Sequence, residues 1–409
     1  MKKNFFNYLN LSLYLCLSLV LLTTCDLFDN SEPKPLPPGC QYDIPWPSLA
    51  GSPWPMLHRN PQAIGRGDQI LANLGQIKWE FNFSELGEDL VSGVVVGTDS
   101  SIYFVTEMHF SAGLYCVDHS GNQKWKVELG AVHRYTTPII TVTNNILVLD
   151  YDTLRCFNNN GILLWSYGFD SNIFWWLDSP QIDKHGNIYL LDNLKNLYKI
   201  SANGNLQWTL NNSYFRSAIG QFGMSFAPDG ETLYIPGDDV LLVALNVINK
   251  EIKWVYGEQS RLRSPIVDSD GNIYCQLNDR IVALDPNGQL IWEFRFNQSE
   301  INDNKLILDK NGNFFFASKD SLYSLDFYGK LRWNVDLSSV SDSYLNCDQE
   351  GNLYVVCLKN NITMMKYNNL GKIDWSIDFI TDHQYYSWPL ISYDNTIILP
   401  TIRKIFAIN

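Results

Sequence analysis

Aromatic and arginine side chains, which are frequent at binding hot spots, gather in a few short segments of this 409-residue chain. Trp175 and Trp176 are the strongest candidates for binding, because neighbouring residues of a strand point to opposite faces and one sheet cannot bury both. The full candidate binding face is His133, Arg134, Tyr135, Trp175, Trp176, Arg216, Arg261, Arg263, His383, Tyr385, Tyr386 and Trp388. The alternative is that several of these side chains only fill the interior of the fold.

Motifs of catalysis and of metal binding are missing from the sequence. The 6 His residues are scattered, and neither HExxH, GxSxG nor GxxxxGK[ST] occurs. Asp268 with Asp270, and Asp309 with Asn311, resemble calcium-loop ligands, but the full loop pattern is missing and a hairpin turn accounts for them. We therefore expect no catalytic residue, no metal site and no cofactor.

Composition and charge narrow the class further. Hydrophobic residues make up 45% of the chain and charged residues 18%, which is typical of a globular protein. The net charge of −13 argues against a nucleic-acid ligand, because phosphate binding needs basic groups. We expect a monomer whose partner is an envelope protein or an extended ligand, with an acidic group favoured by the local arginines.

The first residues of the chain read as a targeting signal. Lys2 and Lys3 precede an apolar run from Leu11 to Leu22, which suits a signal peptide and is short for a spanning helix. The run ends at Cys25 in a pattern that resembles the bacterial lipobox. We therefore predict a lipoprotein signal peptide over 1–24, lipid attachment at Cys25, and a lipid-anchored protein of the bacterial cell envelope, periplasmic or surface-facing. An ordinary signal peptide with an incidental Cys is the alternative.

The segments after the signal differ in composition from the rest of the chain. Prolines are dense between Pro33 and Pro61, and such a stretch favours an extended spacer. We predict a tether over 25–50 and a lead-in segment over 51–74. Six further cysteines have no CxxC spacing, which favours buried thiols, although an envelope location permits disulfides: Cys40, Cys116, Cys156, Cys275, Cys347 and Cys357.

Eight tryptophans mark an internal repeat with intervals of 38 to 46 residues, the size of one propeller blade. They are Trp79, Trp125, Trp165, Trp208, Trp254, Trp292, Trp333 and Trp375. A Gly lies four residues before each of these Trp residues except Trp254, where the position is Lys250. Short β-rich runs separated by Gly and Asn turns fill each unit, so we predict an all-β fold.

The repeats resemble the PQQ-like (pyrroloquinoline-quinone-like) repeat family, whose tryptophan-docking motif matches Ala283-Leu-Asp285-Pro-Asn-Gly288-Gln-Leu-Ile-Trp292. Ser52 to Gly65 is similar to the lead-in of secreted members. The resemblance covers 75–409 and implies an eight-bladed β-propeller of four-stranded blades. It also implies that each Trp lies on the outermost strand and packs between adjacent blades.

The two ends of the repeat region complement each other. The run Lys404 to Asn409 lacks a following Trp strand, whereas Gly75 to Phe81 is a Trp strand with no repeat before it. We expect the first strand to complete the last blade and close the ring, which removes exposed sheet edges.

The sequence indicates the function less directly than the fold, because one fold can serve many activities. The resembled family includes quinoprotein dehydrogenases, which have a Cys-Cys pair that this chain lacks, and a propeller lipoprotein of the outer-membrane β-barrel assembly machinery. We predict a non-enzymatic, lipid-anchored binding scaffold. A quinone-binding enzyme and a carbohydrate binder are the alternatives.

Overall fold

The computed structural model describes residues 38–409 except 72–73, 109–110, 131–135, 151, 170–178, 217–222, 258–263, 278, 297–304, 319–320, 338–341, 359–360 and 380–386. Residues 39–409 form one compact unit. In these described ranges, no helix is long and apolar enough to cross a membrane. The one helical element among them is the short 3-10 helix η1 (Ser84–Leu86).

The strands follow one another along the chain in groups, most of them of four strands, with one strand alone at the start, five in the next group and three in the last. The first groups are β1 (Ile77–Asn82); β2 (Asp89–Leu90), β3 (Val95–Val96), β4 (Ile102–Met108), β5 (Ser111–Val117), β6 (Gln123–Leu129); β7 (Ile139–Ile140), β8 (Ile146–Asp150), β9 (Thr153–Phe157), β10 (Leu163–Gly168); β11 (Gln181–Ile182), β12 (Ile188–Leu191), β13 (Asn196–Ile200), β14 (Leu206–Asn211); and β15 (Ser225–Phe226), β16 (Thr232–Pro236), β17 (Leu242–Asn246), β18 (Glu251–Tyr256).

The remaining groups are β19 (Ile266–Val267), β20 (Ile273–Gln276), β21 (Arg280–Leu284), β22 (Leu290–Arg295); β23 (Ile307–Leu308), β24 (Phe314–Ser318), β25 (Ser321–Leu325), β26 (Leu331–Asp336); β27 (Asp342–Cys347), β28 (Leu353–Leu358), β29 (Ile362–Tyr367), β30 (Ile373–Phe379); and β31 (Leu390–Ile391), β32 (Ile397–Pro400), β33 (Lys404–Ile408).

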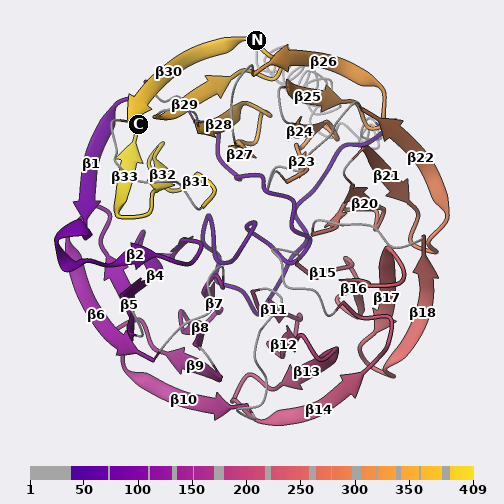
Figure 1. Cartoon of the computed structure of the whole chain (residues 1–409), viewed down its shortest axis with the longest axis horizontal. Coiled ribbons are helices and arrows are strands. Elements are labelled where there is room, and N and C mark those ends of the chain that lie inside the picture. Colours follow the sequence, from indigo (N-terminus) through magenta and orange to yellow (C-terminus); the bar gives the residue numbers. More distant parts are fainter. Residues whose placement is uncertain are drawn as a thin grey trace, which may run out of the picture. The chain divides into compact units, whose positions relative to one another are not determined.

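The described strands form eight antiparallel sheets, which follow one another around a ring (Figure 1). Seven of these sheets have four strands, and the sheet of β4 has five because both β2 and β3 pair with β4. The all-β, eight-bladed propeller predicted from the sequence is thus confirmed. We number the blades 1 to 8 from the sheet of β4 to the sheet of β33, and call the first strand of each blade, β3 or its equivalent, the inner strand.

A hairpin turn joins each inner strand to the next strand, and polar groups of the turn form hydrogen bonds within it. In blade 5, Asp268 accepts hydrogen bonds from the backbone N–H groups of Asp270 and Asn272. Its second oxygen accepts from the Asn272 amide and the Tyr274 hydroxyl, both at 2.8 Å. Gly271 sits at φ +90°, which only glycine adopts without strain. The carboxylates that resembled calcium ligands therefore serve as turn-forming groups in this structure.

The eight predicted docking tryptophans all lie half-buried on outer strands. A Cβ added to Gly329 would lie 2.6 Å from the indole of Trp292 in the preceding blade, so only a glycine leaves room for the ring. The Trp292 Nε1–H donates to the carbonyl of Phe327 at 3.1 Å. Ring contact and hydrogen bond together fasten one blade to the next, and the same Gly–Trp contact recurs at Trp79, Trp125, Trp165, Trp254, Trp333 and Trp375.

We expect Trp292→Ala to lower the free energy of unfolding by about 3 kcal/mol, the low end for Trp truncation because this ring is half-buried. Urea unfolding followed by circular dichroism measures the change. Leu290→Ala is the matched control, because Leu290 lies on the same strand with 53% of its surface exposed. Equal effects of the two substitutions would contradict the docking role.

The last blade contains strands from both ends of the repeat region. The sheet order is β1-β33-β32-β31, with Trp79 opposite Ala407 and Phe81 opposite Ile405. The carbonyl of Asn409 also accepts hydrogen bonds from the N–H groups of Leu74 and Gly75, at 2.8 and 2.7 Å. Strand β33 therefore has a partner on each side.

The packed unit begins earlier than the sequence suggested. Residues 39–50 were predicted to belong to the tether, yet Trp46, Leu49 and Ala50 are at most 9% exposed and belong to the core. The correction has a simple cause: a proline-rich extended segment lacks internal hydrogen bonds whether it is solvated or laid against other strands. Here residues 39–71 are laid against the blades, and we call this segment the strap.

Candidate functional site: a channel closed by the strap

The strap runs across the centre of the ring and contacts the inner strand of every blade (Figure 1). Backbone N–H groups of six inner strands donate to strap carbonyls: Val96 to Trp54, Ile140 to Pro55, Phe226 to Pro61, Val267 to Gln62, Leu308 to Ile64 and Cys347 to Gly65, at 2.8 to 3.3 Å. The Trp46 indole donates to the carbonyl of Ile182 in β11 at 3.0 Å. In blade 8, a Cβ on Gly67 would lie 2.7 Å from Ile391. The strap therefore fills the channel that the inner strands surround.

Two arginines of the strap, the buried Arg66 and the half-buried Arg59, converge on one carboxylate. Arg66 Nη2 lies 2.7 Å and Arg59 Nη1 3.1 Å from Asp43 Oδ1. Burial raises the pKa of Asp43, but the two guanidinium groups outweigh burial and lower the pKa to about 2. The ion pairs fold the strap back on itself, since Asp43 and Arg66 lie near its two ends.

We expect acid to remove the contribution of Asp43 to stability. The folded-state pKa lies below the ordinary value of 3.8, so the stabilisation is present above about pH 4 and is lost as the pH falls toward 2. The Asp43 side chain is 49% exposed, so solvent screening limits the effect to about 1 kcal/mol.

Urea unfolding of wild type and Asp43→Asn checks this expectation: the difference between them should be present at pH 6 and shrink at pH 3. Asp270→Asn, at an exposed turn position, is the control, and its effect should not follow the same course. A difference for Asp43→Asn that is equal at both pH values would contradict the ion-pair role.

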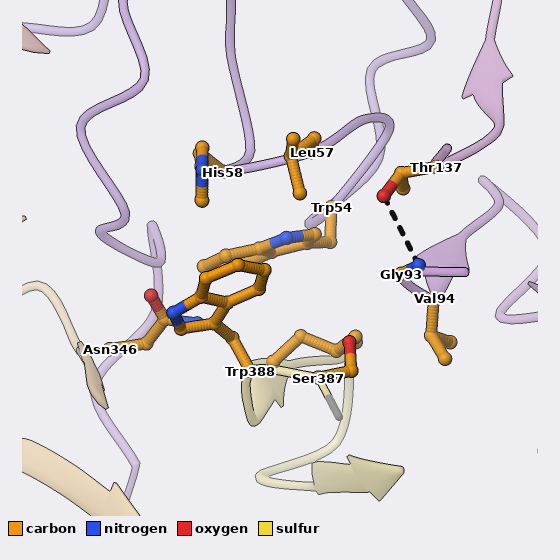
Figure 2. Close-up of a pocket in the computed structure, with 10 residues that line it drawn as sticks. Trp54, Leu57, His58, Gly93, Val94, Thr137, Asn346, Ser387 and Trp388 are labelled. Carbon is orange, nitrogen blue, oxygen red and sulfur yellow. Dashed lines mark hydrogen bonds between the residues drawn. The ribbon is translucent and has the colours of Figure 1, made fainter. Parts of the chain in front are cut away.

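Residues 54–58, which we call the tip of the strap, lie against the start of three inner strands, and these segments line a small cavity (Figure 2). Trp54 lines this cavity together with His58 and Trp388, and the ring centroids of His58 and Trp388 are 5.0 Å apart in an edge-on arrangement. Trp388 also contacts Tyr344 edge-on at 5.8 Å. The cavity has a volume of about 10 Å³, which is close to the space of one water molecule.

His58 is buried beside this cavity, which affects its protonation. Burial lowers the pKa of His58 well below its ordinary value, and the charge of Lys305 lowers it further, so the imidazole is neutral at pH 7.

Three non-glycine residues of the strap, His58, Arg59 and Ala63, have φ between 59° and 77°. Each such residue costs of order 1–3 kcal/mol, which the contacts of the strap with the inner strands must outweigh.

A band of Ser and Thr hydroxyls links neighbouring blades around the channel, and the sequence analysis missed it. Thr137 Oγ1 of blade 2 accepts from the Gly93 N–H of blade 1 at 3.2 Å, and Ser179 Oγ of blade 3 accepts from the Thr137 N–H at 2.6 Å. Ser264 Oγ accepts from the Gly223 N–H in the same way at 2.7 Å. The available signal was a Ser-Pro or Thr-Pro pair before an inner strand, at Thr137, Ser179 and Ser264.

Most of the predicted binding face lies outside the described residues. This applies to His133, Arg134, Tyr135, Trp175, Trp176, Arg261, Arg263, His383, Tyr385 and Tyr386. The two that are described do not form an open surface: Arg216 is 7% exposed, and Trp388 is half-buried against the strap. For these two residues the assignment to a binding face is corrected to filling of the interior, because the strap occupies the channel beside Trp388.

The cysteines and metal candidates add no further site in the described part of the chain. The six predicted thiols are free, and all except Cys40 are buried. Burial raises the pKa of Cys116 and Cys156 to about 11, which keeps these thiols protonated and unreactive at pH 7. No group of three or more His, Cys, Asp or Glu side chains that could hold a metal occurs among the described residues.

These features define the class of the protein: an eight-bladed β-propeller with a strap through its channel, whose repeats resemble those of the PQQ-like family. A family model described as "Outer membrane protein assembly factor BamB" matches residues 111–274. A search of curated proteins finds no relative of this chain.

Solved structures share the fold at low sequence identity. BamB from Moraxella catarrhalis is 12% identical with a TM-score of 0.60, over 83% of this chain and 99% of that one. The quinohemoprotein alcohol dehydrogenase from Comamonas testosteroni is 12% identical with a TM-score of 0.65, over 87% and 80%. A europium-containing methanol dehydrogenase is 12% identical with a TM-score of 0.63, over 85% and 89%. The fold is therefore shared by an outer membrane protein assembly factor and by dehydrogenases.

Proposed function

We propose that this protein is a non-enzymatic binding scaffold of the bacterial cell envelope, whose partner docks where the outer strand of each blade connects to the inner strand of the next. The observation that carries the proposal is the closed channel. The strap fills the passage beside the inner strands, so a partner at this end of the ring meets a floor rather than an open pore. The match to the BamB family model supports a protein partner.

The connections themselves are expected to supply the contacts. Trp175, Trp176, Arg261 and Arg263 lie on two of them, and aromatic and Arg anchors commonly contribute 2 kcal/mol or more each to binding. In an acidic chain, clustered arginines also form a local positive site that favours an acidic partner.

The experiment is capture of envelope proteins by the quadruple variant Trp175→Ala, Trp176→Ala, Arg261→Ala and Arg263→Ala. We expect an unchanged melting temperature and at least a 30-fold weaker capture of the main wild-type partner. A control with four alanines at exposed outer-strand residues, Leu163, Leu206, Leu290 and Leu331, should capture it normally. A folded quadruple variant that captures the same protein with equal affinity would refute this binding face.

The small cavity at the tip of the strap does not support an enzymatic function. The alcohol dehydrogenase of the same fold is named a quinohemoprotein, but a cavity of about 10 Å³ is far too small for a fused-ring quinone. No catalytic step is therefore assigned to this cavity. Absorbance of the purified protein with added pyrroloquinoline quinone and calcium tests the alternative directly, and a bound spectrum would favour it.

Membrane attachment is proposed to depend on Cys25. We expect Cys25→Ala to move the protein from the membrane to the soluble fraction, because an acylated N-terminal Cys is the predicted anchor. Cys40→Ala is the matched control and should leave the distribution unchanged. If the Cys25 variant still sediments with membranes after a high-salt wash, the lipid-anchor proposal is wrong.

A further inference from the structure

A second cavity, separate from the channel tip, opens between blades 2 and 3 beside the strap. Its volume is about 230 Å³, and it is lined by the turn of blade 2 at Thr141–Asn145, the turn of blade 3 around Gly186, and Ser48 of the strap. Leu147, Ile182 and Ile188 form apolar walls, and the polar residues of the lining include Thr141, Asn145, Lys184 and His185. The proposed binding at the connections between blades does not involve this cavity.

The cavity exists because one repeated position is filled by a short side chain. In blades 1, 3 and 4, the second residue of the turn after the inner strand faces the fourth residue of the corresponding turn in the next blade. Thr98 of blade 1 donates a hydrogen bond to Asn144 of blade 2 at 2.9 Å. Pro228 of blade 4 lies 3.8 Å from the position of a Cβ on Gly271 of blade 5. In blade 2 this position is Val142, which is 57% exposed.

Blade 3 shows what kind of group such a gap accepts. The stem of Lys184 covers Gly230 of blade 4, with its Cγ and Cδ 2.9 Å from the position of an added Cβ. Its ammonium donates to the carbonyl of Pro228 at 2.6 Å and lies 5.3 Å from the ring centre of Trp46. An unbranched alkyl chain with a terminal ammonium therefore fits the gap between blades 3 and 4.

The equivalent place between blades 2 and 3 lacks that filling. The nearest side-chain atoms to a Cβ on Gly186 would be the Cβ atoms of Ala202 at 3.3 Å and Ser48 at 3.8 Å, both from small residues. By the repeat, Val142 corresponds to Lys184, Gly186 to Gly230, and the carbonyl of Lys184 to that of Pro228.

We propose that the cavity between blades 2 and 3 binds a primary alkylammonium group, which takes the place beside Gly186 that the Lys184 side chain takes beside Gly230. The alkyl chain lies along Leu147, Ile182 and Ile188, and the ammonium meets the carbonyl and hydroxyl oxygens of the two turns. The net charge of −13 favours a cation over an anion of the same shape. The ligand is either a free linear amine or a lysine side chain of a partner protein.

The direct test is titration with n-pentylammonium, followed by nuclear magnetic resonance of the methyl groups of Val142, Ala202 and Ile188. We expect saturable shifts confined to this cavity, and at least tenfold weaker shifts with 1-pentanol, pentanoate and the branched tert-pentylammonium. Equal or tighter binding of pentanol or pentanoate would overturn the proposal, as would the absence of saturable shifts with pentylammonium.

Variants locate the site within the chain. Val142→Lys should fill the gap from within, as Lys184 fills its own gap, and weaken pentylammonium binding at least tenfold. Ile248→Lys is the matched control, because it adds the same charge at a residue that is 58% exposed and does not line the cavity. Ala202→Leu provides a second obstruction from an exposed turn, should Val142→Lys fail to fold. Unchanged affinity in folded Val142→Lys or Ala202→Leu would refute the site.

The two sources of the ligand are separated by comparing 1,5-diaminopentane with Nα-acetyl-lysine N-methylamide. At least tenfold tighter binding of the diamine indicates a free amine, whereas equal or tighter binding of the lysine derivative indicates a partner's lysine. If neither compound binds and pentylammonium causes no saturable shifts, the proposal is overturned. The proposed binding face at the other end of the channel is not affected by that result.

Discussion

Removal of residues 404–409 is expected to abolish cooperative folding. Strand β33 pairs with β1 on one side and β32 on the other, and Ile405, Phe406, Ala407 and Ile408 are at most 4% exposed. Loss of these side chains and of both hydrogen-bond ladders should cost more than about 5 kcal/mol, which approaches the whole stability of a domain. Thermal unfolding by calorimetry measures the outcome.

The control for this truncation is deletion of 26–37, in the predicted tether before the packed unit. We expect its melting temperature to stay within about 2 °C of wild type, because no described contact depends on it. A protein without 404–409 that melts cooperatively at the wild-type temperature would show that the β1–β33 pairing does not contribute to stability.

Trp54→Ala should be the most damaging single substitution in the strap. The side chain is 3% exposed, lines the cavity at the tip of the strap with His58 and Trp388, and belongs to the core that blades 1, 7 and 8 share (Figure 2). We expect the free energy of unfolding to fall by about 4 kcal/mol, as for other buried Trp truncations. Urea unfolding of purified protein measures the loss.

Two companion variants make this prediction specific to the channel. Trp54→Phe should lose less than half as much as Trp54→Ala, because a second ring keeps most of the packing. Tyr42→Ala removes an aromatic strap residue that is 54% exposed and should cost at most about 1 kcal/mol. If Trp54→Ala unfolds at the same urea concentration as Tyr42→Ala, the strap does not contribute to the core as described.

The sequence predicted well those features that repeat within a few residues. The spacing of Gly288 and Trp292 marks a turn and an outer strand in one short stretch, and the structure places them so. The Asp268 turn is equally local in its main hydrogen bonds, since those that the Asp268 carboxylate accepts join residues at most six apart. Local patterns of this kind are set by backbone conformation and therefore survive without knowledge of the neighbours.

The features that escaped prediction depend on contacts between distant residues. Nothing in the composition around Trp46 distinguishes an exposed tether from a strap that donates to Ile182 of another blade. The hydroxyl link from Ser179 to Thr137 joins separate repeats, so its signal is visible only once the blades are adjacent. Arg216 was expected on the binding face because Arg is frequent at binding hot spots, and its burial reflects tertiary packing.

The pairing of β1 with β33 has a consequence for biosynthesis. A ribosome produces β1 and the strap first and β33 last, and at 5–20 residues per second the interval between them is on the order of tens of seconds. During that interval the strap has no complete set of inner strands to bind, and each finished blade exposes the surface meant for its neighbour. The native topology therefore delays completion until the whole chain is present, which makes the unfinished chain a substrate for chaperones and proteases.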